Sequence, residues 1–264
     1  MLTTFQNTPF TLVLSGGGAL GIAHLGVLYD LEKLQLLPSE IVGTSMGGII
    51  GACLSIGMSE YEIYREIKSF SSVSKWIKFS FSGNAIIDNS KIESIFHTLF
   101  GDKKMNETII PLKLIATNLK NGHKRVFDEN DDIYIKDAIL ATMAIPGIFN
   151  EYSIQGDIYG DGFLCENLGV NEATHHHVLA VDVLGKNAFE KELPDNFFKT
   201  ANILEMFEKS MRLLIYNQSQ IHMKNSAKNI LLLQPETKKY NTFHFHKYKE
   251  IRALGLGLLK YYSN

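Results

Sequence analysis

Residues 11–57 read TLVLSGGGALGIAHLGVLYDLEKLQLLPSEIVGTSMGGIIGACLSIG. A short β-prone run over 11–14 leads into a turn of consecutive glycines, and apolar residues then recur at helical spacing over 19–37. Pro38 follows directly and marks the end of this helix. The stretch therefore opens with a strand, a glycine turn and a helix.

A second unit of the same kind follows at once. Residues 40–42 are predicted to form a strand, residues 43–47 a tight glycine turn, and residues 48–56 a helix of small side chains. Two such units in succession predict parallel strands that are connected by helices, which is the α/β architecture.

The remainder of the chain continues this alternation without an internal repeat or a linker. Strands are expected over residues 112–117, 125–127, 152–159, 177–183 and 229–233, and helices over most of 58–101, over 135–144 and 203–221, and from about 248 onward, with a polar surface loop over 185–199. The sequence therefore predicts a single α/β domain with a central, mainly parallel sheet.

The composition excludes several classes of protein. The 264 residues include 26 Lys and Arg against 28 Asp and Glu, so the chain lacks the basic excess of a dedicated nucleic-acid binder. Two cysteines cannot form a disulfide framework, which favours a reducing compartment. The first ten residues lack Lys and Arg, and glycines interrupt the apolar run 10–27, so neither a secretory signal nor a membrane span is expected. We expect a cytoplasmic protein, with peripheral attachment at the inner membrane also open.

The turn at residues 43–47, Gly-Thr-Ser-Met-Gly, matches the pattern G-x-S-x-G. Between a strand and a helix, this spacing places Ser45 on a sharp turn at the helix N-terminus, where the helix dipole favours developing negative charge. A serine in that position can act as a nucleophile. The simpler alternative is a glycine-rich turn in which Ser45 only caps the helix. The position between a strand and a helix of small residues favours the nucleophile.

The first glycine turn, residues 16–21, matches G-x-G-x-x-G directly after a strand. A dinucleotide-binding domain needs an acidic residue at the end of its second strand, whereas here Glu40 stands at the start of that strand rather than after it. The alternative is an oxyanion hole, in which the backbone N–H groups of Gly17 and Gly18 stabilise a tetrahedral intermediate. Because both glycine turns follow parallel strands, both open at the same edge of the sheet. This convergence favours the oxyanion hole.

A serine nucleophile also needs a base, and nine histidines are available. A triad with His222, His244 or His246 would follow the order Ser…Asp…His of α/β-hydrolases. In that fold the nucleophile follows several strands, whereas Ser45 follows only the second, so the triad is the weaker hypothesis. His24 lies one turn after the glycines and is expected to pack within the first helix or to orient it.

Taken in order, these segments resemble the patatin-like phospholipase family. The matching pieces are residues 14–28, 43–48, 111–122 and 141–149, and then the run Gly160-Asp161-Gly162 with Asn167 downstream. The similarity covers about residues 10–185. It implies a three-layer fold with a catalytic core over residues 8–185, and with C-terminal helices and a last strand over residues 186–264 that complete the same domain.

The resemblance also implies roles for single residues. Ser45 would be the nucleophile and Asp161 its base, in a Ser–Asp dyad without histidine. The oxyanion hole would comprise Gly16, Gly17, Gly18, Gly21 and Met46, with Gly43, Gly47, Gly160 and Gly162 shaping the motifs. No metal and no organic cofactor is implied. Phe163 stands where the family usually has Gly or Ala, and Leu168 where it usually has Pro, but neither departure removes a catalytic atom.

The activity implied is hydrolysis of fatty-acyl esters of phospholipids or lysophospholipids through an acyl-enzyme. The alternatives are a thioesterase or general carboxylesterase with the same dyad, and a non-catalytic lipid-binding regulatory protein. An apolar lining from Ile145, Ile148, Phe149 and Phe163 would raise the pKa of Asp161 and suit acyl chains.

Residues 75–81 hold the only tryptophan and are the candidate for peripheral membrane contact. The alternative is that these residues belong to the core of a helical cap. Nucleic acid is not an expected partner, and the sequence carries no signal for an oligomeric state.

Overall fold

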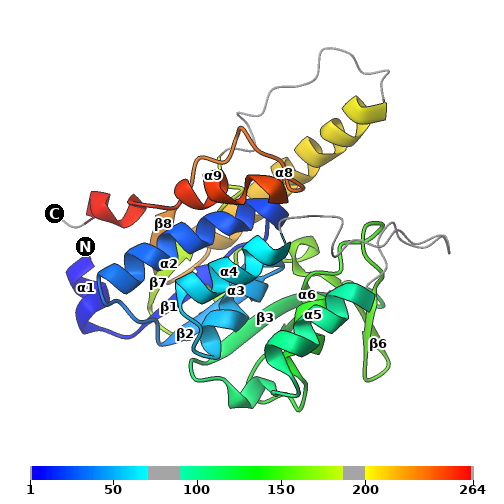
Figure 1. Cartoon of the computed structure of the whole chain (residues 1–264), viewed down its shortest axis with the longest axis horizontal. Coiled ribbons are helices and arrows are strands. Elements are labelled where there is room, and N and C mark those ends of the chain that lie inside the picture. The colour runs from blue at the N-terminus through cyan, green and yellow to red at the C-terminus, as the bar shows by residue number, and fades with distance from the viewer. Residues whose placement is uncertain (1, 71–89, 187–199, 263–264) are drawn as a thin grey trace.

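A computed structural model describes residues 2–70, 90–186 and 200–262 of the chain. Within these residues eight strands form one sheet (Figure 1). The strands are β1 (Phe10–Leu14), β2 (Glu40–Thr44), β3 (Leu112–Asn118), β4 (Lys124–Phe127), β5 (Tyr152–Ile154), β6 (Asp157–Asp161), β7 (His177–Val181) and β8 (Asn229–Leu233). Strands β8, β7, β1, β2 and β3 are parallel neighbours, whereas β4, β5 and β6 pair in antiparallel fashion. The prediction of a mainly parallel sheet is confirmed.

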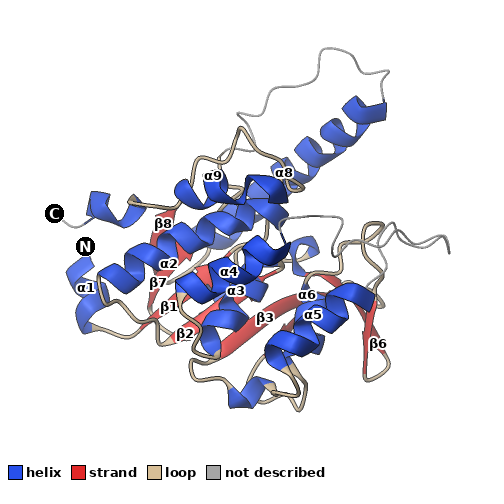
Figure 2. Ribbon diagram, viewed as in Figure 1, coloured by secondary structure: helices blue, strands red, loops and turns tan. Residues whose placement is uncertain are grey.

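The helices confirm the predicted alternation and refine its boundaries (Figure 2). They are α1 (Leu2–Asn7), α2 (Ala23–Lys33), α3 (Met46–Ser55), α4 (Glu60–Phe70), α5 (Ser90–Phe100), α6 (Ile135–Thr142), α8 (Thr200–Lys224) and α9 (Tyr248–Ala253), with short 3₁₀ turns at Gly18–Ile22, Met105–Glu107, Gly162–Leu164, Val170–Glu172, Phe245–Lys247 and Leu258–Tyr262. Two expectations were wrong in detail. The first predicted helix starts as a 3₁₀ turn over Gly18–Ile22, and its α-helical part ends at Lys33 rather than at residue 37. The predicted strand over 152–159 is a hairpin that turns at Gln155 and Gly156, both with positive φ.

Two apolar layers cover the sheet, one on each face. Alternate residues of β1 point to opposite faces, so Leu12 and Leu14 join the larger core, whereas Val13 joins the smaller one. Helices α2, α3, α5, α6 and α9 contribute buried residues to the larger core. On the other face, Leu168 and Val170 pack against the sheet, with Met223 of α8 beside them. The chain therefore has the predicted three layers.

Two sequence expectations fall outside the described residues. Residues 75–81, the candidate for membrane contact, lie in the first gap, and most of the predicted polar loop lies in the second. Among the helices that the structure does describe, none combines the length and the apolar character that crossing a membrane requires.

Candidate active site

Ser45 occupies the sharp turn between β2 and α3. Its backbone has φ 52° and ψ −123°, a strained conformation for a residue other than glycine and the one expected where a strand turns abruptly into a helix. The turn packs tightly against the end of β1, because a Cβ atom on Gly47 would lie 2.3 Å from the Leu14 carbonyl oxygen. Only glycine fits there. Ser45 is thus held at the carboxyl edge of the sheet, as predicted.

Thr142, the last residue of α6, forms a hydrogen bond with this turn. The Ser45 backbone N–H donates to Thr142 Oγ1 over 3.0 Å, and the Thr142 hydroxyl in turn donates to the carbonyl oxygen of Ile115 in β3. All three residues are buried. The sequence placed Thr142 in a family-like segment but gave it no role. Its hydroxyl joins the strained turn to the neighbouring strand.

The first glycine turn lies directly beside Ser45, since β1 and β2 are parallel neighbours with Leu14 opposite Gly43. A Cβ atom on Gly16 would lie 3.1 Å from the Ser45 Cβ and 2.6 Å from Asn167 Oδ1. Within the described part of the chain, the amides of Gly17 and Gly18 donate to no protein acceptor and are therefore able to donate to a ligand.

Gly21 lies one turn further along, in the 3₁₀ segment before α2. A Cβ atom there would come within 2.4 Å of Met46 Cγ, so the absence of a side chain lets Met46, the first residue of α3, pack close to the glycine turn. The structure thus brings together all five residues predicted to form an oxyanion hole.

Asp161 reaches Ser45 through the pairing of β3. Strand β2 ends with Thr44 opposite Ile115, and β6 ends with Asp161 opposite Ala116, the next residue of β3. Both strands use the same edge of β3, because β4 occupies the other edge. Strands β2 and β6 therefore run toward each other and end almost at the same point. The candidate nucleophile and the candidate base therefore meet where a parallel and an antiparallel strand end at the same point.

The Asp161 carboxyl group is fully buried. Its Oδ1 accepts a hydrogen bond of 3.0 Å from the Phe163 backbone N–H, and its Oδ2 has no hydrogen-bond partner. Burial raises the pKa of Asp161 from 3.8 to about 7, and the Phe163 amide and the Ser45 hydroxyl act against this rise. A carboxylate with a pKa near neutrality, next to a serine hydroxyl, can accept and return a proton at working pH.

The glycines on either side of Asp161 differ in what they permit. A Cβ atom on Gly162 would lie 2.2 Å from the Ile115 carbonyl oxygen, so the chain passes β3 at a distance that only glycine allows. At Gly160 the nearest atoms belong to the Leu119 side chain, at 3.0 Å. Gly162, rather than Gly160, therefore fixes how Asp161 approaches the end of β2.

The histidines make their contacts elsewhere. His24 is buried in α2, where its ring donates to the Ser15 carbonyl oxygen over 2.9 Å, and burial lowers its pKa to about 4, so the ring is neutral. His222 lies 3.3 Å from Glu166, and His244 accepts a hydrogen bond from the Asn241 amide. Neither of these, nor His246, lines the pocket that contains Ser45.

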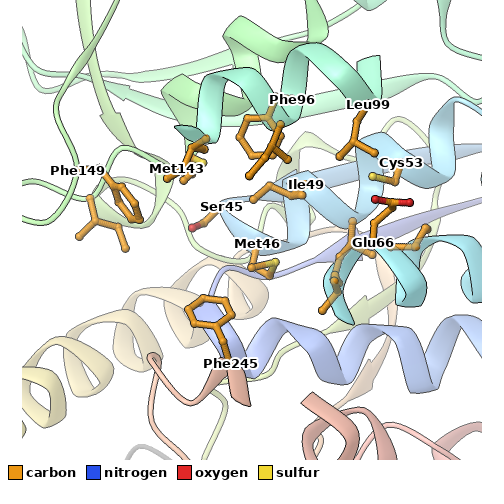
Figure 3. Close-up of a pocket in the computed structure, with 17 residues that line it drawn as sticks. Ser45, Met46, Ile49, Cys53, Glu66, Phe96, Leu99, Met143, Phe149 and Phe245 are labelled. Carbon is orange, nitrogen blue, oxygen red and sulfur yellow. The ribbon is translucent and has the colours of Figure 1, made fainter. Parts of the chain in front are cut away.

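An apolar pocket opens at Ser45 (Figure 3). Its walls come from α3, α4 and α5, from the segment after α6, and from Phe245 near the C-terminus. Ile145 and Phe149 line it as predicted. Ile148 and Phe163 do not line it; both pack partly buried against the larger core. The unusual Phe163 therefore contributes its backbone amide to Asp161 and leaves the pocket open.

The C-terminal part of the chain supplies contacts that the sequence did not suggest. The Thr242 carbonyl oxygen accepts the Ala19 amide over 2.9 Å, and the Thr242 amide donates to Glu208 Oε1 over 3.0 Å. Arg212, itself buried, donates to the same Glu208 oxygen over 2.8 Å. Because Ala19 follows the glycine turn, this network ties α8 to the predicted oxyanion hole. No local pattern around these residues distinguishes them from solvent-facing charges.

No group of three or more His, Cys, Asp or Glu side chains is arranged to hold a metal ion, as far as the described residues extend.

Comparison with known proteins places this site in a family. A family model described as patatin-like phospholipase matches residues 12–174. The lysophospholipases NTE1 of Scheffersomyces stipitis and Candida albicans are 25% and 27% identical to this chain, over 277 and 279 residues. Each alignment covers 95% of this chain but only 18% and 20% of the two yeast proteins. The chain thus spans about a fifth of the length of these relatives.

A bacterial relative and a solved structure extend the comparison. An uncharacterized NTE family protein of Mycobacterium bovis is 27% identical over 158 residues, which is 60% of this chain and 43% of that protein. The crystal structure of VipD from Legionella pneumophila matches with a TM-score of 0.50 and 12% identity, over 93% of this chain and 66% of that chain, a likeness of fold. Since the family model covers more than half of the sequence, including both glycine turns and Asp161, the chain belongs to the patatin-like phospholipase family.

Proposed function

We propose that this chain hydrolyses fatty-acyl esters of lysophospholipids and phospholipids, with Ser45 as nucleophile and Asp161 as general base. The observation that carries the proposal is the meeting of β2 and β6 on β3, which presents a strained serine to a buried carboxyl group at an apolar pocket. A serine hydroxyl is a weak nucleophile and needs a nearby group to take its proton. Asp161 is suited to that task, because burial raises its pKa to about 7.

The reaction would proceed in two halves. Ser45 Oγ attacks the ester carbonyl carbon while its proton passes to the Asp161 carboxylate, and the carbonyl oxygen becomes an oxyanion. The amides of Gly17, Gly18 and Met46 are the donors that would stabilise this charge. When the ester C–O bond breaks, the leaving alcohol takes the proton from Asp161 and the acyl group stays on Ser45. Water then repeats these steps, releases the fatty acid and restores both side chains.

The apolar pocket supports an acyl group as the substrate portion that binds beside Ser45. The yeast relatives are named lysophospholipases, which favours esters with a single acyl chain as the first class to test. A thioesterase or a general carboxylesterase would use the same groups, and a non-catalytic lipid-binding protein would keep the pocket but fail to form an acyl-enzyme. Peripheral contact with a lipid surface, through residues 75–81, remains part of the proposal as a prediction.

A fluorophosphonate probe tests the proposal directly. Intact-mass spectrometry should show one adduct on the wild-type protein, and peptide mapping should place it on Ser45. The Ser45→Ala variant should stay unmodified, and Asp161→Asn should react far more slowly. Product analysis on mixed lipids then separates the lipid acyl hydrolase from the thioesterase and carboxylesterase. Labelling of another residue, or none in a folded protein, would show that the proposed nucleophile is wrong.

A further inference from the structure

The pocket continues away from Ser45 along one face of α3. Met46, Ile49, Ile50 and Cys53 line it at helical spacing, so successive turns of α3 form one wall. The opposite wall comes from α4 and α5, through Ile63, Ile67, Ile92, Ile95, Phe96 and Leu99. In Figure 3, Ser45 and Cys53 lie at different levels of α3, with Phe96 and Leu99 across the pocket from them. The result is an apolar arm enclosed by three helices.

The length of this arm follows from helix geometry. Cys53 comes eight residues after Ser45, which at ~1.5 Å per residue corresponds to roughly 12 Å along α3. A straight hydrocarbon chain advances about 1.25 Å per carbon, given carbon–carbon bonds of ~1.5 Å at tetrahedral angles. An acyl group attached to Ser45 would therefore reach Cys53 with about its tenth carbon.

The far end of the arm carries a charge. Of the seventeen described residues that line the pocket, Glu66 of α4 has the sole formally charged side chain. Its carboxylate lies near Cys53 in Figure 3 and acts on the thiol electrostatically: burial first, and then the Glu66 charge, raise the pKa of Cys53 to about 12. Glu66 is half-buried, and no described cation is in ion-pair contact with it.

An acyl chain is the occupant that this chemistry fits. A phosphate or carboxylate group in the arm would need a cation, and the described lining contains no Lys, Arg or His. Methylenes gain from burial along α3, but a chain that passes Cys53 meets a carboxylate that must keep its hydration. Further carbons therefore gain nothing and displace water from a charge.

We propose that Cys53 and Glu66 close the acyl-binding arm about ten carbons from Ser45 and so make the enzyme selective for medium-length acyl chains. The inference rests on the proposed function, since it takes Ser45 as the point of acyl attachment.

The test measures kcat/KM on p-nitrophenyl esters from butanoyl to hexadecanoyl, each kept monomeric. For the wild type, kcat/KM should rise by up to roughly fourfold per methylene and reach its maximum near decanoyl. Glu66→Leu, which removes the charge, should move this maximum toward dodecanoyl or longer. Cys53→Met, which lengthens the side chain at the end of the arm, should move it toward octanoyl or shorter.

Two matched substitutions outside the pocket serve as controls. Glu93→Leu makes the same change at an exposed position of α5, and Cys165→Met does so at a cysteine whose thiol contacts the Gly122 carbonyl oxygen. Neither should move the maximum.

An unchanged maximum in Glu66→Leu, with a wild-type melting temperature, would overturn the inference while leaving the proposed function intact. If Cys53→Met does not fold, Glu66→Leu decides alone, and the rates at which alkyl fluorophosphonates of different length label Ser45 provide a second measure without turnover. If no ester is cleaved and no probe reacts, the proposed function fails instead.

Discussion

The N-terminal and C-terminal regions of the chain both contribute residues near Ser45. They differ in how far these contributions could be predicted from the sequence. In the N-terminal region, backbone approaches backbone so closely that one residue type fits, as at Gly47, where a Cβ atom would lie 2.3 Å from the Leu14 carbonyl oxygen. In the C-terminal region, Thr242 and Phe245 reach the site through contacts that many side chains could make. A recognisable motif therefore appears where the backbone leaves room for only one residue type. Residues that support the site from far away in the sequence show no such local pattern.

The largest effect should come from the N-terminal region. Ser45→Ala removes the proposed nucleophile and should lower ester hydrolysis by roughly 10³-fold or more. Circular dichroism and the melting temperature should stay close to wild type, because one oxygen is lost from the edge of a pocket. Near-wild-type turnover in this variant would show that Ser45 is not the nucleophile.

Asp161→Asn should be nearly as damaging, with a loss of roughly 10²–10⁴-fold, because an amide cannot accept the serine proton. Single alanine substitutions at His222, His244 and His246 should each be mild, since these rings lie outside the pocket. A histidine variant as inactive as Asp161→Asn, with its fold preserved, would restore the Ser-His-Asp hypothesis.

The pH dependence sharpens the role of Asp161. Its pKa of about 7 predicts that kcat/KM rises with pH and levels off above about 7, as the base loses its proton. The free energy of unfolding depends on pH in the opposite direction to kcat/KM. A carboxyl group whose folded-state pKa exceeds its ordinary value of 3.8 contributes stability below about pH 4, and this contribution is lost as the pH rises through about 7.

Asp161→Asn should therefore gain melting temperature relative to wild type as the pH rises across that window. A difference that does not vary with pH would show that Asp161 is not the group that titrates.

Thr142→Val should have an intermediate effect. It leaves the Ser45 amide and the Ile115 carbonyl oxygen without their shared partner, which should destabilise the fold by about 1–3 kcal/mol. The same loss should misplace the nucleophile and lower kcat by up to about a hundredfold. Thr142→Ser keeps the hydroxyl and should restore kcat. If Thr142→Ser loses as much kcat as Thr142→Val, the hydroxyl alone is not sufficient to position Ser45, because serine keeps these hydrogen bonds and lacks only the methyl group.

The smallest effect is expected from the C-terminal region. Phe245→Ala removes an apolar wall from the pocket and should raise KM for a medium-chain ester by about fivefold, with little change in kcat. Phe243→Ala, two residues away and 53% exposed, is the matched control and should leave KM unchanged. Equal behaviour of the two variants would show that the C-terminal region supports the fold but not the binding of substrate.

Much of the fold and the site could be predicted from local sequence. Alternating strands and helices, and a strand followed by a glycine turn, depend on neighbours along the chain, so the position of Ser45 was accessible. The role of Thr142 was not, because it depends on α6 lying beside the turn after β2. The Glu208–Arg212 pair was equally hidden, since its burial depends on packing between segments far apart in sequence.

The converging ends of β2 and β6 make the proposed reaction depend on two different parts of the sheet. The proposed nucleophile and oxyanion donors lie on consecutive parallel units, whereas the proposed base lies on a separate antiparallel hairpin, β5–β6, which pairs with the same edge of β3. Under the proposed mechanism, the proton acceptor that turns binding into turnover therefore depends on how this hairpin pairs with β3, whereas the pocket and the glycine turns do not. Because strand side chains alternate between faces, a slip of one residue between β6 and β3 would have the same effect as losing the carboxylate.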